Sequence, residues 1–136
     1  MNLLLAVVLI LRHTHEGSYG IAINKPLNMT LPSVVINLPG PAPTAFKDNK
    51  IFHGGKIQRL NMLHELPEAG GEELPMSLEP IYAGGDIEEA AAMVEKDLSL
   101  SEKVHFYVGC YTWYSNEYID YCFPHDLGFL IASMKR

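Results

Sequence analysis

Runs of apolar residues separated by glycine and proline predict that the chain is built mainly from short strands. Residues 3–12 are almost all Val, Leu and Ile, which is typical of a strand that is buried on both faces. After a polar turn at 13–17, residues 19–24 alternate again and predict a second strand. These segments predict a β-hairpin, and Pro26 ends it because proline has no N–H to donate to a neighbouring strand.

The helical period is clearest at residues 86–98. Asp86 is a good N-cap, and Glu88 and Glu89 place negative charge in the first turn, where the helix dipole favours it. The apolar positions of this segment fall on one face at helical spacing: Ile87, Ala90, Ala91, Val94 and Leu98. Thr30 predicts the start of a second, shorter helix with a proline in its first turn.

Further short strands are predicted at 51–52, 60–65, 104–110 and 127–132, and Ser115 predicts a helix that reaches about Cys122. Prolines and glycines predict two loops without regular structure, at 39–50 and 67–80. Because strands occur both as a hairpin and singly between helices, the pattern favours an α+β fold over a doubly wound sheet. The length of 136 residues fits a single domain, 1–136.

Two similar segments each place a glycine pair after a strand. IFHGGKI at 51–57 contains Gly54 and Gly55, and IYAGGDI at 81–87 contains Gly84 and Gly85. A phosphate-binding loop needs further glycines or a Gly-Lys-Ser/Thr ending before a helix, and neither segment has them. The second pair leads into a helix N-terminus, which can bind anions, but Asp86 puts its own carboxylate there. We therefore interpret both segments as turns that need glycine for backbone reasons.

The distribution of charge argues against nucleic acid as a partner. The formal net charge is −6, of which residues 1–68 contribute +2 and residues 69–136 contribute −8. An acidic surface repels phosphate, and no cluster of Lys and Arg supplies the basic patch that nucleic-acid binding requires. We therefore expect no nucleic-acid partner.

The cysteines and the apolar start bear on where the protein resides. Cys110 and Cys122 lack the spacing and the companions of a zinc site, and two reduced thiols in a cytoplasmic protein are the simplest interpretation. A disulfide is the alternative and would need an oxidising compartment. The apolar run at 3–11 is shorter than the ~20 residues of a membrane span and lacks the basic start of a signal peptide. We expect a cytoplasmic location and no membrane contact.

The sequence contains no motif that declares a chemistry. HExxH and GxSxG motifs are absent, and Cys110 falls in an apolar strand, where a reactive thiolate is disfavoured. The histidines lack helical ligand spacing, so we expect no metal and no cofactor. The stretch 105–121 holds seven of the 13 Phe, Trp and Tyr residues. Core packing explains this stretch, and a ligand pocket or partner surface is the alternative.

Four stretches carry a resemblance to a known family: VVLILRHTHEGSYGIAINKPLNMTL (7–31), IFHGGKIQRLNMLHE (51–65), IYAGGDIEE (81–89) and VHFYVGCYTWYSNE (104–117). The first contains an H…G..G…N.P pattern formed by His13, Gly17, Gly20, Asn24 and Pro26. Leu63-His64, Gly84-Gly85-Asp86 and the pair Gly109 and Trp113 match further positions. On these residues the chain resembles the AlgH-like family, a bacterial family without an assigned activity.

The resemblance implies an α+β fold with a bent, partly barrel-like mixed β-sheet flanked by helices. It carries over no catalytic residue, because none is established for the family. Members are often labelled transcriptional regulators, and our first hypothesis is a non-enzymatic regulatory protein that acts through an unknown protein partner. The alternative is a small-ligand-binding protein or an enzyme with a cleft near Asn24, His64, Asp86 and Trp113. Direct DNA binding ranks last.

Overall fold

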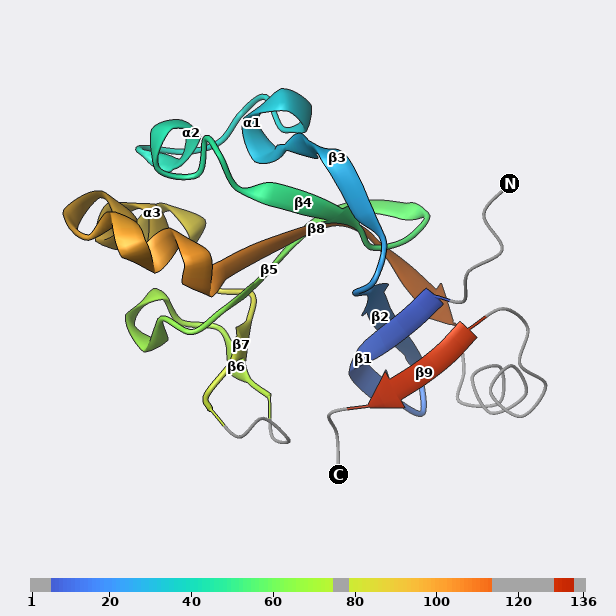
Figure 1. Cartoon of the computed structure of the whole chain (residues 1–136). Coiled ribbons are helices and arrows are strands. Elements are labelled where there is room, and N and C mark those ends of the chain that lie inside the picture. The colour runs from blue at the N-terminus through green and yellow to red at the C-terminus, as the bar shows by residue number, and fades with distance from the viewer. Residues whose placement is uncertain (1–5, 75–78, 114–128, 134–136) are drawn as a thin grey trace.

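The computed structural model of the chain describes residues 6–74, 79–113 and 129–133, and a curled mixed sheet forms its centre (Figure 1). The strands are β1 (Ala6–Thr14), β2 (Gly17–Ala22), β3 (Pro26–Thr30), β4 (Lys50–His53), β5 (Ile57–His64), β6 (Glu72–Glu73), β7 (Tyr82–Ala83), β8 (Val104–Trp113) and β9 (Phe129–Ser133). Their order is β6-β7-β5-β8-β2-β1-β9, while β4 pairs with β8 and β3 pairs with β4. Parallel and antiparallel pairs both occur, so the mixed sheet and the α+β class are confirmed.

The predicted N-terminal hairpin is confirmed. β1 and β2 are antiparallel and close with Thr14 opposite Gly17, so β1 runs two residues beyond the predicted end at position 12. A short polar side chain helps to fix this turn, because the Thr14 hydroxyl donates to the Gly17 carbonyl at 3.2 Å. The outer edge of β1 pairs in parallel with β9, with Val8 opposite Ile131. The first strand is therefore buried within the sheet, as its apolar run predicts.

β8 connects the two halves of the sheet. One edge of β8 pairs with β5 along most of its length. Its other edge pairs first with β4, with Ile51 opposite Phe106, and then with β2, with Ser18 opposite Trp113. The change of neighbour occurs at Gly109, where the chain leaving β4 crosses over β8.

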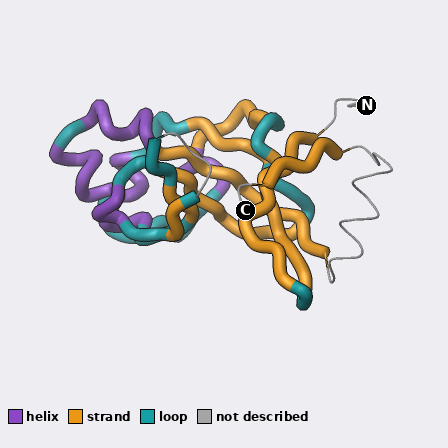
Figure 2. The backbone as a smooth tube through the Cα atoms, turned by 90° about the horizontal axis from the view of Figure 1, so that it is seen from below, coloured by secondary structure: helices purple, strands orange, loops and turns teal. Residues whose placement is uncertain are grey.

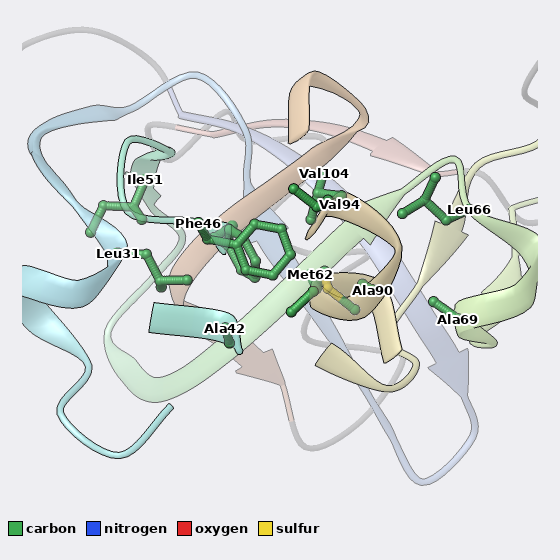
Figure 3. Packing of buried hydrophobic residues seen from close by; sticks show 12 residues of the cluster. Leu31, Ala42, Phe46, Ile51, Met62, Leu66, Ala69, Ala90, Val94 and Val104 are labelled. Carbon is green, nitrogen blue, oxygen red and sulfur yellow. The ribbon is translucent and has the colours of Figure 1, made fainter. Parts of the chain in front are cut away.

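The helices gather at one end of the molecule, whereas the strands extend beyond them to the other end (Figure 2). They are α1 (Leu31–Val34), α2 (Ala42–Ala45), α3 (Ile87–Lys96) and the 3-10 helices η1 (Pro67–Ala69) and η2 (Leu98–Lys103). Between them and the sheet lies the largest apolar cluster, in which Phe46 is central (Figure 3). Its ring meets that of Phe106 edge-on at 5.0 Å, and burying such a side chain is worth roughly 1.5–3 kcal/mol.

A second cluster lies on the opposite face of the sheet and contains Leu9, Ile21, Leu63, Leu74, Tyr107 and Cys110. Leu9 comes from β1 and Leu74 follows β6, so residues near both ends of the strand order belong to one cluster, and Leu11 and Leu74 line one pocket. The sheet must curl toward this face to allow that arrangement, and we call it the concave face. The bent, partly barrel-like sheet is thereby confirmed.

Three local predictions are corrected. The segment 67–80 was expected to lack regular structure, but it contains η1 and β6. The segment 39–50 was expected to lack regular structure, but its prolines lie at the start of α2, where the N–H that proline lacks has no helical partner to lose. Pro26 was expected only to end the hairpin, yet it begins β3, and proline is tolerated at the first residue of an edge strand. The helix predicted from Ser115 to Cys122 lies outside the described residues.

Candidate functional site

His64 holds together the turn that contains the second glycine pair. Its Nε2 lies 2.9 Å from the Gly84 carbonyl oxygen, and its Nδ1 accepts the Leu66 N–H at 3.1 Å. An acceptor at Nδ1 requires the proton to be on Nε2, so the neutral Nε2–H tautomer donates to Gly84. The side chain is 1% exposed and stacks on Tyr82, with ring centroids 5.6 Å apart.

Burial lowers the pKa of His64 below its usual value, although its backbone hydrogen bonds oppose the shift. The ring is therefore held neutral. Because both ring nitrogens already have backbone partners, His64 acts as a structural link between β5 and the turn.

Asp86 lies at the other end of the same turn and caps α3. Its Oδ1 accepts the N–H groups of Glu88 at 2.9 Å and Glu89 at 3.3 Å. The predicted N-cap is confirmed, and α3 begins at the next residue. His64 and Asp86 thus border one turn from two sides, and both of them are engaged by the backbone.

Asn24 and Trp113 lie in the other half of the sheet. The Asn24 side chain accepts the Val7 N–H at 2.8 Å, and Trp113 packs in a third apolar cluster beside Ala6 and Val8. His64 is opposite Val104 at one end of β8, and Trp113 ends that strand nine residues later, about 30 Å away at strand spacing. His64 and Trp113 therefore lie toward opposite ends of β8, and the strand does not bring these two residues together.

The motif glycines have steric explanations. A Cβ at Gly54, Gly55 or Gly109 would overlap the backbone of the crossing segment at each of the three positions. A Cβ at Gly20 would lie 2.6 Å from the Leu9 carbonyl oxygen in the hairpin. Gly17 closes that hairpin, opposite Thr14, and the backbone of His13 pairs with Ser18. The turn interpretation of both Gly-Gly segments agrees with this geometry.

A pocket of about 230 Å³ opens beside the second glycine pair. It is bounded by residues of β1, β2, β5, β6 and β7 and by the start of α3: Leu11, Tyr19, Arg59, Leu60, Asn61, Met62, Glu72, Leu74, Ala83, Gly84, Gly85 and Ile87. We call it the Arg59 pocket. None of the four proposed site residues lines it.

Arg59 brings a positive charge to this pocket. Its guanidinium lies 5.1 Å from the centre of the Tyr19 ring, a cation–π arrangement that bridges β5 and β2 across the concave face. The Cys110 thiol lies nearby, where burial raises its pKa and the charge of Arg59 opposes that rise. Cys110 is a free, buried thiol, as predicted.

Asn61 provides a buried polar group in the same pocket. It is 8% exposed, and its Nδ2 donates to the carbonyl oxygens of Gly109 at 3.1 Å and Arg59 at 3.3 Å. Within the described parts of the chain, nothing donates to its Oδ1. Sequence reasoning missed Arg59 and Asn61 because their only signal was an alternating pattern in a half-exposed strand.

The backbone of Leu60 is open along one edge of β5. The Gly84 N–H donates to the Met62 carbonyl, so the N–H and C=O groups of Met62 point toward β7. The direction of the backbone N–H and C=O groups alternates from one residue to the next along an antiparallel strand. Leu60 lies two residues before Met62, so its N–H and C=O groups point to the same side. β7 pairs only with Leu63 and His64, so among residues 6–74, 79–113 and 129–133 no group bonds to this edge of Leu60.

Two other kinds of site were considered over the described residues. No three His, Cys, Asp or Glu side chains come close enough together there to hold a metal ion. Among residues 6–74, 79–113 and 129–133, no helix is long and apolar enough to cross a membrane.

Comparison with known proteins identifies the family. An AlgH-like family model matches residues 2–118. A UPF0301 protein of Bacteroides fragilis is 31% identical over 110 residues, which cover 79% of this chain and 53% of the relative. A UPF0301 protein of Thioalkalivibrio sulfidiphilus is also 31% identical over 78 residues, 56% of this chain and 42% of that protein. The chain spans about half the length of the curated relatives it matches.

The fold has a relative of known structure. The solution structure of the AlgH protein from Pseudomonas aeruginosa covers 86% of this chain, and the match spans 61% of that protein. The TM-score is 0.56 and the sequence identity is 19%, so this match bears on the fold alone. No specific activity comes with any of these relatives, and on the match over residues 2–118 the chain belongs to the AlgH-like family.

Proposed function

We propose that this chain is a non-enzymatic regulatory protein that acts by binding a protein partner through the open edge of β5. The observation that carries the proposal is the backbone of Leu60 beside the Arg59 pocket, to which no described residue bonds along this edge of β5. An unpaired strand edge presents alternating donors and acceptors to which an extended segment of another protein can add. Pockets beside such an edge then select the partner's side chains.

The surroundings of Leu60 support a partner at this edge. Ile57, at the start of β5, is 51% exposed, so an apolar side chain is available to a partner close to this edge. β6 and β7 lie beside the far end of β5 only (Figure 1). An added strand would extend the sheet past Leu60 and cover Ile57.

The motif residues also favour binding over catalysis. His64, Asp86 and Asn24 are each hydrogen-bonded to backbone N–H groups, and His64 is held neutral by burial. A nucleophile and general base within hydrogen-bonding reach of each other would favour an enzyme. The Ser99 hydroxyl donates to Asp97 Oδ1 at 2.7 Å, but this exposed carboxylate also accepts the Ser99 N–H as the N-cap of η2, so the contact is explained by helix capping. The proposal places the protein in the bacterial cytoplasm and, because of its acidic charge, away from nucleic acid.

Site-specific photocrosslinking in cells tests the proposal. A photoreactive amino acid at Gln58, which is exposed on β5, is expected to give a discrete adduct with one protein. The same group at Glu95, exposed on α3, is the matched control and should not give that adduct. With the purified partner, exchange of the Leu60 amide proton should slow, and Ile57→Asp should weaken binding. Equal crosslinking from both positions, or unchanged Leu60 exchange, would contradict the proposal.

A small-ligand-binding protein is the second candidate. The Arg59 pocket favours it, because a cationic group and a buried amide converge on one cavity. This pocket replaces the cleft expected near Asn24, His64, Asp86 and Trp113 as the place where such a ligand would bind.

A further inference from the structure

We propose that the Arg59 pocket binds a small α-amino acid in its zwitterionic form, with the carboxylate on Arg59 and the ammonium group on Glu72. The inference rests on the second candidate function and does not require a protein partner. Three properties of the pocket carry it: two opposite charges that form no ion pair with a described residue, a buried acceptor and a small volume.

Arg59 supplies the carboxylate site. No acidic side chain lies within 4.0 Å of its guanidinium in the described part of the chain, where the one ion pair is Lys103 with Glu65. Arg59 is an exposed residue, and its guanidinium stacks on the Tyr19 ring where both side chains line the pocket. A guanidinium presents a planar fork of donors that matches the two oxygens of a carboxylate.

Glu72 supplies the opposite charge on β6, two strands away from Arg59 in the sheet order. It forms no ion pair with a described residue, and Arg59 in particular is not within 4.0 Å of it. A pocket with a separated cation and anion is complementary to a ligand that places its negative group at the cation and its positive group at the anion. A simple carboxylate would leave Glu72 unpaired, and a simple amine would leave Arg59 unpaired.

The buried acceptors favour a ligand that brings N–H donors. The Asn61 Nδ2 donates to two carbonyl oxygens, and no donor group of a described residue bonds to the Asn61 Oδ1. The carbonyl of Leu60 on the open edge of β5 adds a second free acceptor. An ammonium group carries three N–H donors, so it can reach Glu72 and still satisfy an acceptor of the pocket.

The volume limits the ligand to a small one. About 230 Å³ corresponds to roughly eight water molecules at ~30 Å³ each, which is the size of an amino acid with a short side chain. Leu11, Met62, Leu74 and Ile87 supply apolar surface for that side chain. A ligand of about eight non-hydrogen atoms in an open pocket is expected to bind with a Kd on the order of 1 mM.

Ligand-observed NMR with the 20 free amino acids, followed by titration of the best binder, tests the inference. At least one small amino acid is expected to bind, with backbone shifts at Leu60, Asn61 and Gly84. Its N-acetyl and carboxamide derivatives, which each lack one charge, should bind at least ~10-fold more weakly. The proposal would be overturned if no amino acid bound even at concentrations far above a millimolar. It would also be overturned if the chemical-shift changes were confined to other regions.

Four variants assign the two charges. Arg59→Ala should abolish binding, and Arg59→Lys should retain part of it because the charge stays while the fork is lost. Glu72→Gln should lower the affinity for the free amino acid to that for its N-acetyl derivative. Lys56→Ala removes an exposed cation near β5 that does not line the pocket, so affinity should not change. The assignment would be overturned if Lys56→Ala and Arg59→Ala lowered the affinity equally. It would also be overturned if Glu72→Gln still distinguished the free amino acid from its N-acetyl derivative as well as the unchanged protein does.

These outcomes are independent of partner binding. Amino-acid binding without a crosslinked partner would leave this inference standing and remove the regulatory proposal. A crosslinked partner without amino-acid binding would support the regulatory proposal and remove this inference. An N-acetyl derivative that binds as well as the free amino acid would indicate a peptide carboxyl terminus and would overturn the role of Glu72.

Discussion

The imidazole of His64 reaches the Gly84 carbonyl oxygen at 2.9 Å, and this contact joins the end of β5 to the turn that precedes α3. The same ring accepts the Leu66 N–H, so one side chain satisfies backbone groups on two segments. A residue that the sequence offered as a ligand-binding candidate thus has both ring nitrogens engaged by the backbone. The predictions that follow separate structural roles of this kind from binding roles.

The first prediction concerns pH. Burial lowers the pKa of His64 in the folded chain, so the unfolded chain takes up a proton at higher pH than the folded chain does. The stability that this difference contributes is complete above the unfolded pKa of about 6.5 and is lost as the pH falls from there toward the folded value. Urea unfolding between about pH 7.5 and pH 5 should show this loss.

A matched pair of variants assigns the pH effect. His64→Gln cannot titrate and should flatten the acid side of the stability curve, while His105→Gln, at an exposed position, should leave it in place. His64→Ala should cost about 2–4 kcal/mol at neutral pH, because it removes a buried side chain and leaves the Leu66 N–H without its acceptor. Equal slopes for the two Gln variants would contradict the assignment.

The second prediction compares the adjacent glycines of the turn. Gly84 and Gly85 have φ values of 83° and 103°, so alanine is strained at both, by about 1–2 kcal/mol. A Cβ at Gly84 meets nothing within 4 Å, whereas one at Gly85 would lie 2.6 Å from the Ala69 carbonyl oxygen. Gly85→Ala should therefore cost at least ~1–3 kcal/mol more than Gly84→Ala, as measured by denaturant unfolding.

The third prediction concerns Asp86. If its carboxylate serves the helix alone, Asp86→Ala should lower stability by about 1 kcal/mol, and Asp86→Asn should be nearly neutral because both residues are good N-caps. Glu95→Ala, at an exposed position of α3, is the control for the loss of a charge. An Asn variant as unstable as the Ala variant would mean that the charge itself is needed.

The fourth prediction concerns Trp113, the single tryptophan of the chain. It is buried beside Ala6, Val8, Ile10 and Ala22, so Trp113→Ala should cost about 3–5 kcal/mol. Trp113→Phe retains most of the apolar volume and should cost clearly less. Thermal unfolding followed by circular dichroism measures both. A Trp113→Ala variant of wild-type stability would restore the interpretation of Trp113 as a binding residue.

Much of the fold could be predicted from local patterns. The hairpin, the strand at β8 and the Asp86-capped helix follow from periodicity and capping, which are properties of neighbouring residues. The edge strand β3 could not be predicted, because its pairing with β4 depends on residues some 25 positions away. The short helix α2 was not predicted, because prolines usually indicate loops, although they are tolerated in the first turn of a helix.

The candidate site was harder to predict than the fold. Motif matching selected His64, Asp86, Asn24 and Trp113 because they recur with glycines, and the packing of those glycines explains much of the motif. Arg59 and Asn61 have no motif, and their importance comes from curling of the sheet, which brings Tyr19 over β5. Sequence spacing does not encode that curl in any single segment.

The position of β8 in the sheet also has a consequence for synthesis. Its neighbours β2 and β4 precede it by roughly 90 and 55 positions, so both leave the ribosome well before the strand that joins them. Until residue 113 has emerged, the strands already made fall into three groups, β1-β2, β3-β4 and β5-β7-β6, which no strand pairing joins to one another. Such long-range pairing makes folding slow and leaves time for aggregation. The sheet of this chain can therefore be completed only late in synthesis, after β8 has emerged.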